Sequence, residues 1–411
     1  MIHGVDLFCG GGGFTTGLIS ACRALRRQTD LLAINHWNIA IATHTYNHPG
    51  VRHMCESLEL VSPRKVVPEG HLDIMVASLE CTHHSNARGG RPMRDQSRAS
   101  AWHVLQWADA LSIDNIIVEN VREFQDWGPL DDDGKRIKEK AGDTYKAFLQ
   151  AIMSLGYSVE SRVLNAADFG DATTRRRLFI IARRGDRKIN WPAPTHANAW
   201  RPAREIIDWS IPSKSIFDRK KPLAPATMSR ITAGLEKFGT EELKPFLVVF
   251  RNNQGAMPLE RPLPTMTTSG ANFGLCEPFL VRFQGSHKGK DDGARRVHSL
   301  QEPLPVQDTS NRYGLCEPFL VKFYRTGRAC SLDQPVDTIA ARDHIGLVVP
   351  YKKGAALDIN FRMLQPLELA RAMGFPESYV FAGTREAKVK QIGNAVPVHL
   401  AEALCRSVLE D

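Results

Sequence analysis

The sequence has no run of apolar residues long enough to span a membrane. A transmembrane helix requires about 18 to 20 consecutive apolar residues, and no segment of the 411 residues approaches that length. Met1 leads directly into a strand-like run at residues 5–8, whereas a secretion signal has a charged segment followed by an apolar one. We therefore expect neither export nor membrane insertion.

The sequence also lacks paired cysteines. Its 8 cysteines are scattered singly, without a CxxC pair, in a chain too large to depend on disulfides. Cys81, His83 and His84 are close together, but no second ligand pair with the spacing of a zinc finger follows them. These features predict a protein of a reducing cytoplasm without a bound metal.

No strong charge bias is present. Lys and Arg number 53 against 45 Asp and Glu, which leaves +8, and 43% of the residues are hydrophobic. This composition excludes a disordered polyampholyte and a fibre, and the length suggests two or three globular domains. The small positive excess favours a polyanionic partner, of which nucleic acid is the commonest.

The first half of the chain alternates between predicted strands and predicted helices. Such alternation is typical of a mainly parallel, doubly wound α/β sheet, in which ligands bind beyond the carboxyl ends of the strands. Short apolar runs predict strands, and apolar residues at helical spacing predict the helices between them. The strand candidates are 5–8, 31–34, 73–77, 116–118 and 178–182, and the helix candidates are 14–25, 101–111 and 145–155.

Four consecutive glycines follow the first predicted strand, at residues 10–13. Glycines at this place allow the backbone to approach a nucleotide-like ligand, although their spacing is not the GxGxxG of a dinucleotide site. The alternative is a flexible turn without a ligand.

The composition changes near Trp191, where a stretch rich in Pro, Gly, Thr and Arg begins. We predict a first domain at 1–195, a β-rich second region at 196–352, and a return to the first domain at 353–411. The second region contains three copies of a repeat, at about 245–277, 278–317 and 318–350, each opening with Pro-Phe-Leu-Val. Each copy predicts short strands around a polar loop, so the three copies are expected to stack.

The loops of the repeats carry basic and amide side chains, among them Arg251, Asn253, Arg296 and Arg325. Arg and Asn make paired hydrogen bonds to base edges, and Arg also neutralises phosphates. The repeats therefore predict a nucleic-acid surface, with a solvated structural repeat as the alternative.

Two reactive side chains stand at the ends of predicted strands. Cys81 follows the strand at 73–77 and is a candidate nucleophile, although most free cysteines are small buried apolar residues. Glu119 directly follows the predicted strand at 116–118. Burial at this place raises the pKa of a carboxyl group and suits the group to donate a proton. An isolated glutamate at this place has the alternative of capping a helix.

These segments, in this order, resemble the cytosine-C5 DNA methyltransferase family along nearly the whole chain. The resemblance covers the glycine turn, the cysteine loop, the Glu-Asn-Val motif, an arginine motif, a returning segment and a closing motif. The matching residues are 6–14, 80–85, 119–121, 170 with 175–179, 371–376 and 391–397. In that family the variable target-recognition region lies between the arginine motif and the returning segment, where the repeats are found.

The resemblance implies a Rossmann-like fold that binds S-adenosylmethionine and methylates C5 of a flipped-out cytosine in double-stranded DNA. It assigns Cys81 as the nucleophile, Glu119 as the acid that protonates N3, and Arg175 and Arg177 as stabilisers of the extruded base. The residues assigned to the cofactor are Phe8, Gly10, Gly12, Asn35, Glu56, Asn394 and Val396. A prokaryotic or phage cytoplasm is the accompanying expectation. A monomer is favoured, with an interface through the repeats as the alternative, and the sequence leaves open whether a cognate restriction endonuclease accompanies the protein.

The chain departs from the family at the nucleophile loop. Glu80 replaces the usual proline before the cysteine, and Thr82-His83-His84 replaces Gln-Gly-Phe after it. Asn35 stands where the family has an acidic residue for the cofactor ribose. A carboxylate beside Cys81 opposes thiolate formation but is able to accept hydrogen bonds from an exocyclic amino group.

These features support three hypotheses. The first is sequence-specific methylation of cytosine C5. The second keeps the scaffold and cofactor but methylates an exocyclic amino group, N6 of adenine or N4 of cytosine, with Glu80 orienting the amine. The third is a catalytically silent DNA-binding regulator, against which the presence of Cys81, Glu119, Arg175 and Arg177 argues.

Overall fold

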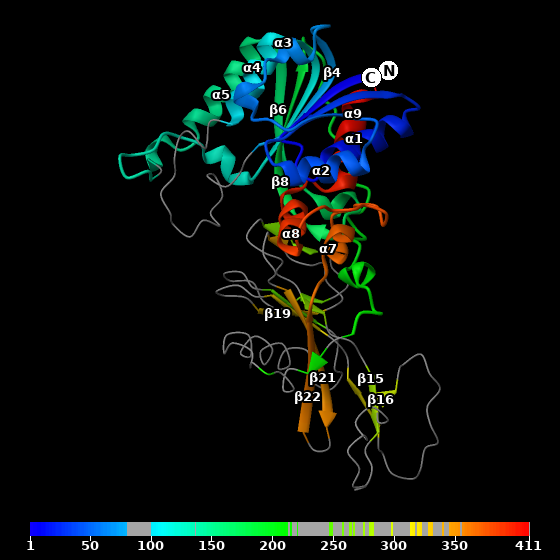
Figure 1. Ribbon diagram of the computed structural model, residues 1–411. Helices are drawn as coiled ribbons and strands as arrows, with labels where there is room; N and C mark the ends of the chain where they lie inside the picture. The colour runs from blue at the N-terminus through cyan, green and yellow to red at the C-terminus, as the bar shows by residue number, and fades with distance from the viewer. Residues whose placement is uncertain are drawn as a thin grey trace.

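The computed structural model describes residues 1–79, 100–135, 137–212, 220 and 362–410 with their side chains. Between residues 214 and 361 it describes the backbone of the strands named below. Figure 1 shows an upper part that contains the amino-terminal sheet and its helices, and a lower, β-rich part.

The upper part is built on a seven-stranded sheet with the order β3-β2-β1-β4-β5-β8-β6. Strands β3, β2, β1, β4 and β5 are parallel, while β8 runs antiparallel to both of its neighbours. The strands are β1 (Ile2–Leu7), β2 (Thr29–Ile34), β3 (Arg52–Met54), β4 (His71–Ser78), β5 (Ser112–Asn120), β6 (Tyr157–Asn165) and β8 (Arg176–Arg184). This arrangement confirms the predicted α/β class with a mainly parallel, doubly wound sheet.

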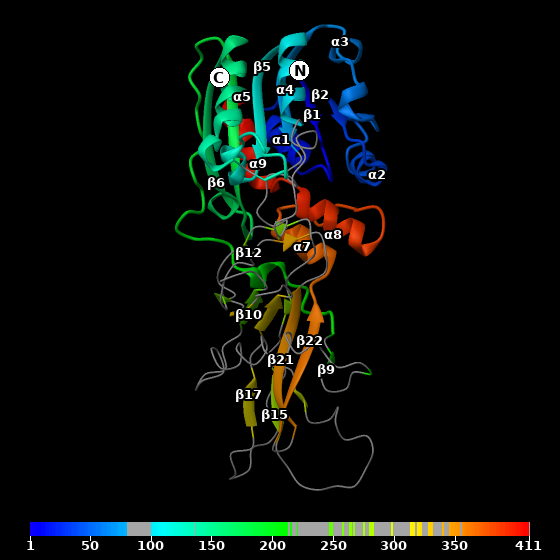
Figure 2. The ribbon, with the colours of Figure 1, turned by 90° about the vertical axis from the view of Figure 1, so that its left-hand side faces the viewer.

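Helices cover both faces of the sheet. In Figure 1, α4 and α5 lie on one side and α1 and α9 on the other, and Figure 2 is turned so that the side with α4 and α5 faces the viewer. The helices are α1 (Gly13–Ala24), α2 (Asn38–Asn47), α3 (Pro63–Val66), α4 (Trp102–Ala110), α5 (Asp143–Ser154), α7 (Pro366–Ala372), α8 (Arg385–Asn394) and α9 (Val398–Leu409). No helix in the described ranges is both long and apolar enough to cross a membrane.

The inner strands of the sheet are apolar on both faces because each face packs against helices. Along β8, Leu178, Ile180 and Ala182 belong to one buried cluster, while Phe179 and Ile181 belong to the cluster on the opposite face. A strand that is buried on both sides reads as a continuous apolar run. This is why the short apolar runs identified β1, β2, β4, β5 and β8, whereas the edge strands β3 and β6, which are more exposed, were not predicted.

The β-rich part contains strands at the starts of all three repeats. β10 (Phe246–Val249), β15 (Phe279–Arg282) and β18 (Phe319–Lys322) occupy equivalent places. In the second and third repeats this strand pairs antiparallel with the closing strand of the same repeat, β17 (Tyr313–Cys316) or β21 (Ile345–Lys353). In the first repeat β10 instead pairs with β18, with β11 (Met257–Pro258) and with β19 (Arg328–Ser331).

The shorter strands of this part are β7 (Thr173–Thr174), β9 (Lys214–Ser215), β11 (Met257–Pro258), β12 (Leu263–Pro264), β13 (Met266–Thr267), β14 (Gly274–Leu275), β16 (Val297–His298), β19 (Arg328–Ser331) and β20 (Ile339–Ala340). β21 forms a long hairpin with β22 (Ala356–Met363), which leads into α7. The predicted return at residue 353 therefore falls within this hairpin.

A buried ion pair joins the two segments that connect the upper and lower parts. Glu368 on α7 accepts two hydrogen bonds from Arg362 at the end of β22, each of 2.9 Å. Arg362 also donates to the carbonyl of Asp208, and the backbone N–H of Asp208 donates to Glu368. The chain leaves the upper part near Asp208 and returns to it through Arg362. Both segments are therefore bonded to the ion pair of Arg362 and Glu368.

Candidate active site

Glu119 lies at the carboxyl end of β5, where its side chain is only 6% exposed. The Nε of Arg177 is 3.1 Å from Glu119 Oε1, and the Nη2 of Arg175 is 3.9 Å from the same oxygen. Both arginine side chains are buried as well. The structure therefore brings together the three residues that the sequence assigned to the acid and arginine motifs.

The direction of β8 explains this convergence. β8 is antiparallel to β5, and Phe179 is paired with Glu119 in the register. The amino end of an antiparallel strand lies at the same edge of the sheet as the carboxyl end of its neighbour. Arg175 and Arg177, at the start of β8, consequently meet the carboxylate at the end of β5.

Burial and the neighbouring arginines change the pKa of Glu119 in opposite directions. Removal from water raises the pKa of Glu119, because the charged form loses its hydration. Arg177 and, more weakly, Arg175 oppose this effect, and the net direction is upward. A carboxyl group with a raised pKa is suited to give a proton to a substrate near neutral pH.

Arg175 also connects this site to the carboxyl-terminal segment. Its Nη1 donates a 3.0 Å hydrogen bond to the backbone carbonyl of Gly393 on α8. Gly393 belongs to the closing motif identified in the sequence, at residues 391–397. The end of the chain thereby helps to fix the guanidinium beside Glu119.

Cys81 and Glu80 lie outside the described residues, so their side chains have no structural account. The chain reaches them from β4, whose last residue Ser78 is paired with Glu119. The N–H of Leu79 donates to the carbonyl of Glu119 at 3.2 Å. The segment that carries Cys81 therefore starts beside the backbone of Glu119.

The glycine turn joins β1 to α1 through left-handed backbone conformations. Phe8, Gly10 and Gly12 have φ angles of 60°, 52° and 85°. A Cβ atom on Gly13 would lie 2.2 Å from the carbonyl oxygen of Val396, so glycine is required there. The structure thus places the turn against Val396, which is 2% exposed.

Two of the polar residues assigned to the cofactor, Asn35 and Glu56, lie just after the ends of β2 and β3. Asn35 Oδ1 accepts a 2.9 Å bond from the N–H of Trp37, and Glu56 Oε1 accepts one of the same length from the N–H of Ser57. The N–H of Glu56 donates to the carbonyl of Asn35. Asn35 and Glu56 are therefore neighbours at the same edge as the glycine turn, each with one side-chain oxygen bonded to local backbone.

The residues of the closing motif differ in exposure. Asn394 is exposed at the end of α8, whereas Val396 packs beside Phe14 in the core. Lys390, one turn before Asn394 on α8, has its ammonium 4.7 Å from the centre of the Trp37 ring. The carboxyl-terminal segment thus contacts both the glycine turn and the loop after β2.

Asp6 provides a test of whether the site fits an adenosyl, amino-acid-like cofactor. One of its carboxylate oxygens, Oδ1, is buried without a hydrogen-bond partner among the described residues, while Oδ2 accepts from Thr15. Burial raises the pKa of Asp6 to about 7. An unsatisfied carboxylate oxygen at the strand that leads into a glycine turn fits a ligand with a donor group.

Tyr379, which packs against the turn from the carboxyl-terminal segment, was not among the residues expected at the site. Its hydroxyl donates to the carbonyl of Gly11, and a Cβ atom on Gly11 would lie 3.3 Å from Gln391, a residue of the closing motif. The signal available was the aromatic run that follows the returning segment, but it gives no indication of a partner hundreds of residues away.

The predicted base-contacting residues Arg251, Asn253, Arg296 and Arg325 lie outside the described residues. Their role stays a prediction.

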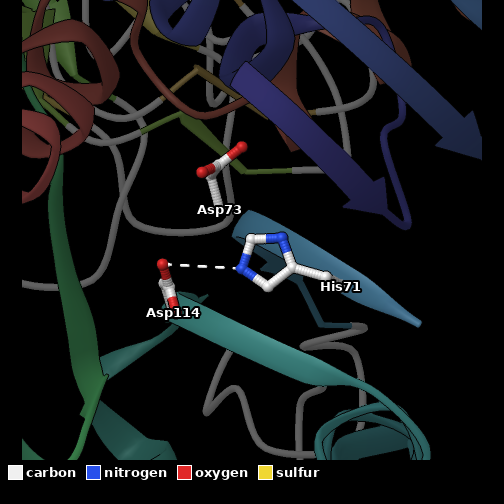
Figure 3. A group of neighbouring side chains, drawn as sticks. All are labelled: His71, Asp73 and Asp114. Carbon is white, nitrogen blue, oxygen red and sulfur yellow. Dashed lines mark ion pairs between the residues drawn. The ribbon is translucent and has the colours of Figure 1, made fainter. Parts of the chain in front are cut away.

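A separate group of metal-ligating side chains lies at the opposite edge of the sheet. Figure 3 shows His71, Asp73 and Asp114, whose ligand atoms lie within 4.8 Å of one another. Asp73 already accepts from the backbone N–H of His3, and Asp114 is paired with Arg187 at 3.3 Å. These pairings account for the cluster without an ion, and Asp114 lies five residues before Glu119 on β5, about 16 Å along the strand.

Comparisons with known proteins agree with this geometry. A family model described as C-5 cytosine-specific DNA methylase matches residues 2–231 and 287–410. The chain is 24% identical over 98% of its length to the type II methyltransferase M.AgeI of Thalassovita gelatinovora, of which it covers 98%. It is also 24% identical to the type II methyltransferase M.DdeI of Desulfomicrobium norvegicum, over 98% of this chain and 88% of that one.

Among solved structures, the Entamoeba histolytica methyltransferase EhMeth has a similar fold. It aligns over 100% of this chain and 98% of its own, with a TM-score of 0.56 and 13% identity.

Proposed function

Because the chain belongs to the C-5 cytosine-specific DNA methylase family, we propose that Cys81 and Glu119 act as its nucleophile and its acid. The protein is a DNA (cytosine-5)-methyltransferase with S-adenosylmethionine as the methyl donor. Neither amino-group methylation nor a silent regulator is favoured by this family membership.

The thiolate of Cys81 adds to C6 of the cytosine, and the ring electrons move toward N3, which takes a proton from Glu119. This addition gives C5 the character of an enamine carbon, which is able to attack a methyl group. S-adenosylmethionine supplies that methyl group. A base then removes the proton from C5, the Cys81 sulfur leaves C6, and the proton on N3 returns, so that the thiolate and the acid are restored.

The observation that carries this proposal is the setting of Glu119. Its carboxyl group is buried, its pKa is raised by that burial, and two arginines stand at 3.1 and 3.9 Å. Leu79, bonded to the backbone of Glu119, leads into the segment that contains Cys81. Burial favours the protonated form of this carboxyl group and the arginines fix its place, so it is suited to deliver a proton without rearrangement.

Arg177 and Arg175 hold Glu119 and limit the rise of its pKa. We expect them also to steady the flipped base, because guanidinium groups donate hydrogen bonds to carbonyl and phosphate oxygens. Arg175 is itself held by the carbonyl of Gly393. Its position therefore depends on the carboxyl-terminal segment being in place.

The cofactor would be held where the glycine turn meets Val396. Phe8, Gly10 and Gly12 shape the turn there, and Asp6 offers a buried carboxylate oxygen that bonds to none of the described residues. Asn35, Glu56 and Asn394, at the neighbouring strand and helix ends, are proposed as additional contacts. A target base must leave the duplex to reach this edge of the sheet, which costs a few kcal/mol of unstacking.

We expect the repeats to read the DNA sequence. Charge-neutral substitution of Arg251, Arg296 or Arg325 should weaken binding or relax specificity at one base pair by about 1–3 kcal/mol. Unchanged methylation patterns in all three variants would contradict this role. A monomeric state and a cognate restriction endonuclease stay predictions.

Trapping on 5-fluorocytosine DNA tests the assignment of Cys81. Fluorine at C5 cannot be removed as a proton, so an enzyme that adds a thiolate to C6 and transfers the methyl group remains covalently bound. We expect a protein–DNA adduct that survives denaturing electrophoresis and requires S-adenosylmethionine. Cys81→Ser should form no adduct, and Cys55→Ser, which alters an exposed cysteine, should form it normally.

Either of two outcomes would contradict the proposal. Near-normal methylation by Cys81→Ser would exclude a covalent step through this residue and would favour transfer to an amino group. DNA binding by the wild-type protein with no methyl transfer to any base would favour the silent regulator.

A further inference from the structure

Two hydroxyl groups hold the carbonyls of the glycine turn. The hydroxyl of Tyr379, in the carboxyl-terminal segment, donates a 2.8 Å hydrogen bond to the carbonyl of Gly11. The hydroxyl of Thr16, in the first turn of α1, donates one of 2.6 Å to the carbonyl of Gly12. Successive carbonyls of the turn are therefore bonded by two parts of the chain that are far apart in sequence.

His48 connects these two hydroxyls. Its Nε2 lies 3.1 Å from the oxygen of Thr16 and 3.2 Å from that of Tyr379. Since each hydroxyl proton is used on a glycine carbonyl, each oxygen is left as an acceptor. His48 must then carry its proton on Nε2 and share it between the two oxygens.

The protonation state of His48 agrees with this assignment. Burial and the neighbouring His53 lower the pKa of His48 to about 4. The imidazole is therefore neutral at pH 7 and has a single N–H. The fully buried ring of His44 contacts the rings of His48 and His53, with a centroid separation of 4.9 Å in each case.

Side chains of the carboxyl-terminal segment and of α2 pack closely against the glycine turn. A Cβ atom on Gly12 would lie 2.4 Å from the hydroxyl oxygen of Tyr379 and 3.1 Å from a carbon of the His44 ring. The Tyr379 ring is itself packed by Phe375 and Phe381, at centroid distances of 4.6 and 5.1 Å. The tyrosine is thus fixed by its own neighbours and does not depend on the turn for its position.

We propose that Tyr379 and His48 are positioning residues that hold the glycine turn in the conformation that receives S-adenosylmethionine. This inference rests on the proposed function, in which the turn binds the cofactor. A turn fixed before the ligand arrives does not lose conformational entropy on binding, so preorganisation appears as cofactor affinity. The chemical step, which takes place at Glu119, should not depend on it.

The test compares variants that remove or retain single hydrogen bonds. Tyr379→Phe deletes the bond to Gly11, His48→Leu deletes the shared donor, and His48→Gln keeps an N–H donor near the Nε2 position. Tyr145→Phe is a matched control, since Tyr145 is buried and its hydroxyl makes a 2.9 Å bond to Ser161, away from the turn. The dissociation constant for S-adenosylhomocysteine is measured calorimetrically without DNA, together with KM for S-adenosylmethionine, kcat and the thermal unfolding midpoint.

We expect Tyr379→Phe and His48→Leu to weaken cofactor binding and raise the cofactor KM by about 3- to 10-fold, the usual size of one lost hydrogen bond. The kcat at saturating cofactor should stay within about twofold of the wild type, since the acid and the nucleophile are untouched. His48→Gln should bind the cofactor nearly as well as the wild type. Tyr145→Phe should change only the unfolding midpoint.

Wild-type affinity in both Tyr379→Phe and His48→Leu would overturn the proposal. So would a fall in kcat at an unchanged cofactor KM, or a loss of affinity in Tyr145→Phe equal to that in Tyr379→Phe. If Tyr379→Phe fails to fold, the comparison of His48→Gln with His48→Leu decides the matter. A wild-type protein that binds the cofactor but forms no 5-methylcytosine refutes the proposed function alone, because the affinities still report on the turn.

Discussion

Replacing Glu119 with Gln removes the proton that the proposed reaction delivers to N3 while it keeps the size and shape of the side chain. The carboxyl group is 6% exposed and faces Arg177 at 3.1 Å and Arg175 at 3.9 Å. The amide of the variant fits the same space and still offers an oxygen to Arg177. We therefore expect the variant to fold, to bind DNA and to bind the cofactor.

The size of the catalytic loss depends on the role of the acid. A positioned general acid contributes about 10²- to 10⁴-fold to a rate, which corresponds to about 3–5 kcal/mol of barrier. We expect kcat/KM for methylation by Glu119→Gln to fall by that factor. Glu69→Gln, which alters an exposed glutamate far from the site, should keep wild-type activity.

The dependence of activity on pH gives a second, independent test of Glu119 as the acid. Burial raises the pKa of Glu119, so the wild type loses the acid form, and with it activity, as the pH rises through that raised value. The variant has no carboxyl to titrate, and its lower activity should lack this alkaline decline. Single-turnover transfer of a labelled methyl group from pH 4.5, the ordinary value for a glutamate carboxyl, up to pH 9 measures both effects. Activity of Glu119→Gln within threefold of the wild type, or an unchanged alkaline decline, would refute the role of Glu119 as the acid.

Three other changes test the account. Gly13→Ala would push a Cβ atom against the Val396 carbonyl, 2.2 Å away, and should cost about 1–3 kcal/mol in urea denaturation. Gly50→Ala, whose added Cβ would meet no described atom within 4 Å, is the control, and equal stability of the two variants would contradict the packing of the turn. Glu368→Gln breaks the buried pair with Arg362 and should cost about 3–5 kcal/mol; a change below about 1 kcal/mol in the same assay would show that the pair does not hold the connecting segments. DNA binding should weaken steeply as salt rises, because the chain carries +8, and a flat salt dependence in a filter-binding titration would count against phosphate contacts.

Much of the catalytic sheet could be predicted because its inner strands are buried on both faces. Apolar runs such as 178–182 mark such strands directly, and the glycines at 10–13 mark the first turn. The antiparallel direction of β8 was not accessible in this way, since an apolar run reads the same in either direction. That direction is what places Arg175 and Arg177 beside Glu119. The sequence motif identified these arginines as site residues. Only the sheet topology explains why they lie beside the carboxylate of Glu119.

The support behind the glycine turn could not be predicted. Tyr379 and His48 are separated by 331 positions, and neither is distinguished by its local pattern. Their contact depends on how α2 and the carboxyl-terminal segment pack around the turn. The ion pair of Glu368 and Arg362 could not be predicted for the same reason, because it depends on how the end of β22 is placed relative to α7. Short-range spacing predicts elements, whereas such pairs arise from the arrangement of elements already formed.

Nucleoside mass spectrometry tests the central claim most directly. Unmethylated genomic DNA is incubated with the purified protein and S-adenosylmethionine, digested, and compared with the products of Cys81→Ser and Glu119→Gln. The account predicts 5-methylcytosine from the wild type, none from Cys81→Ser, and a strongly reduced amount from Glu119→Gln. N6-methyladenine or N4-methylcytosine in place of 5-methylcytosine would contradict the covalent mechanism and would point to Glu80 as the mark of a changed acceptor.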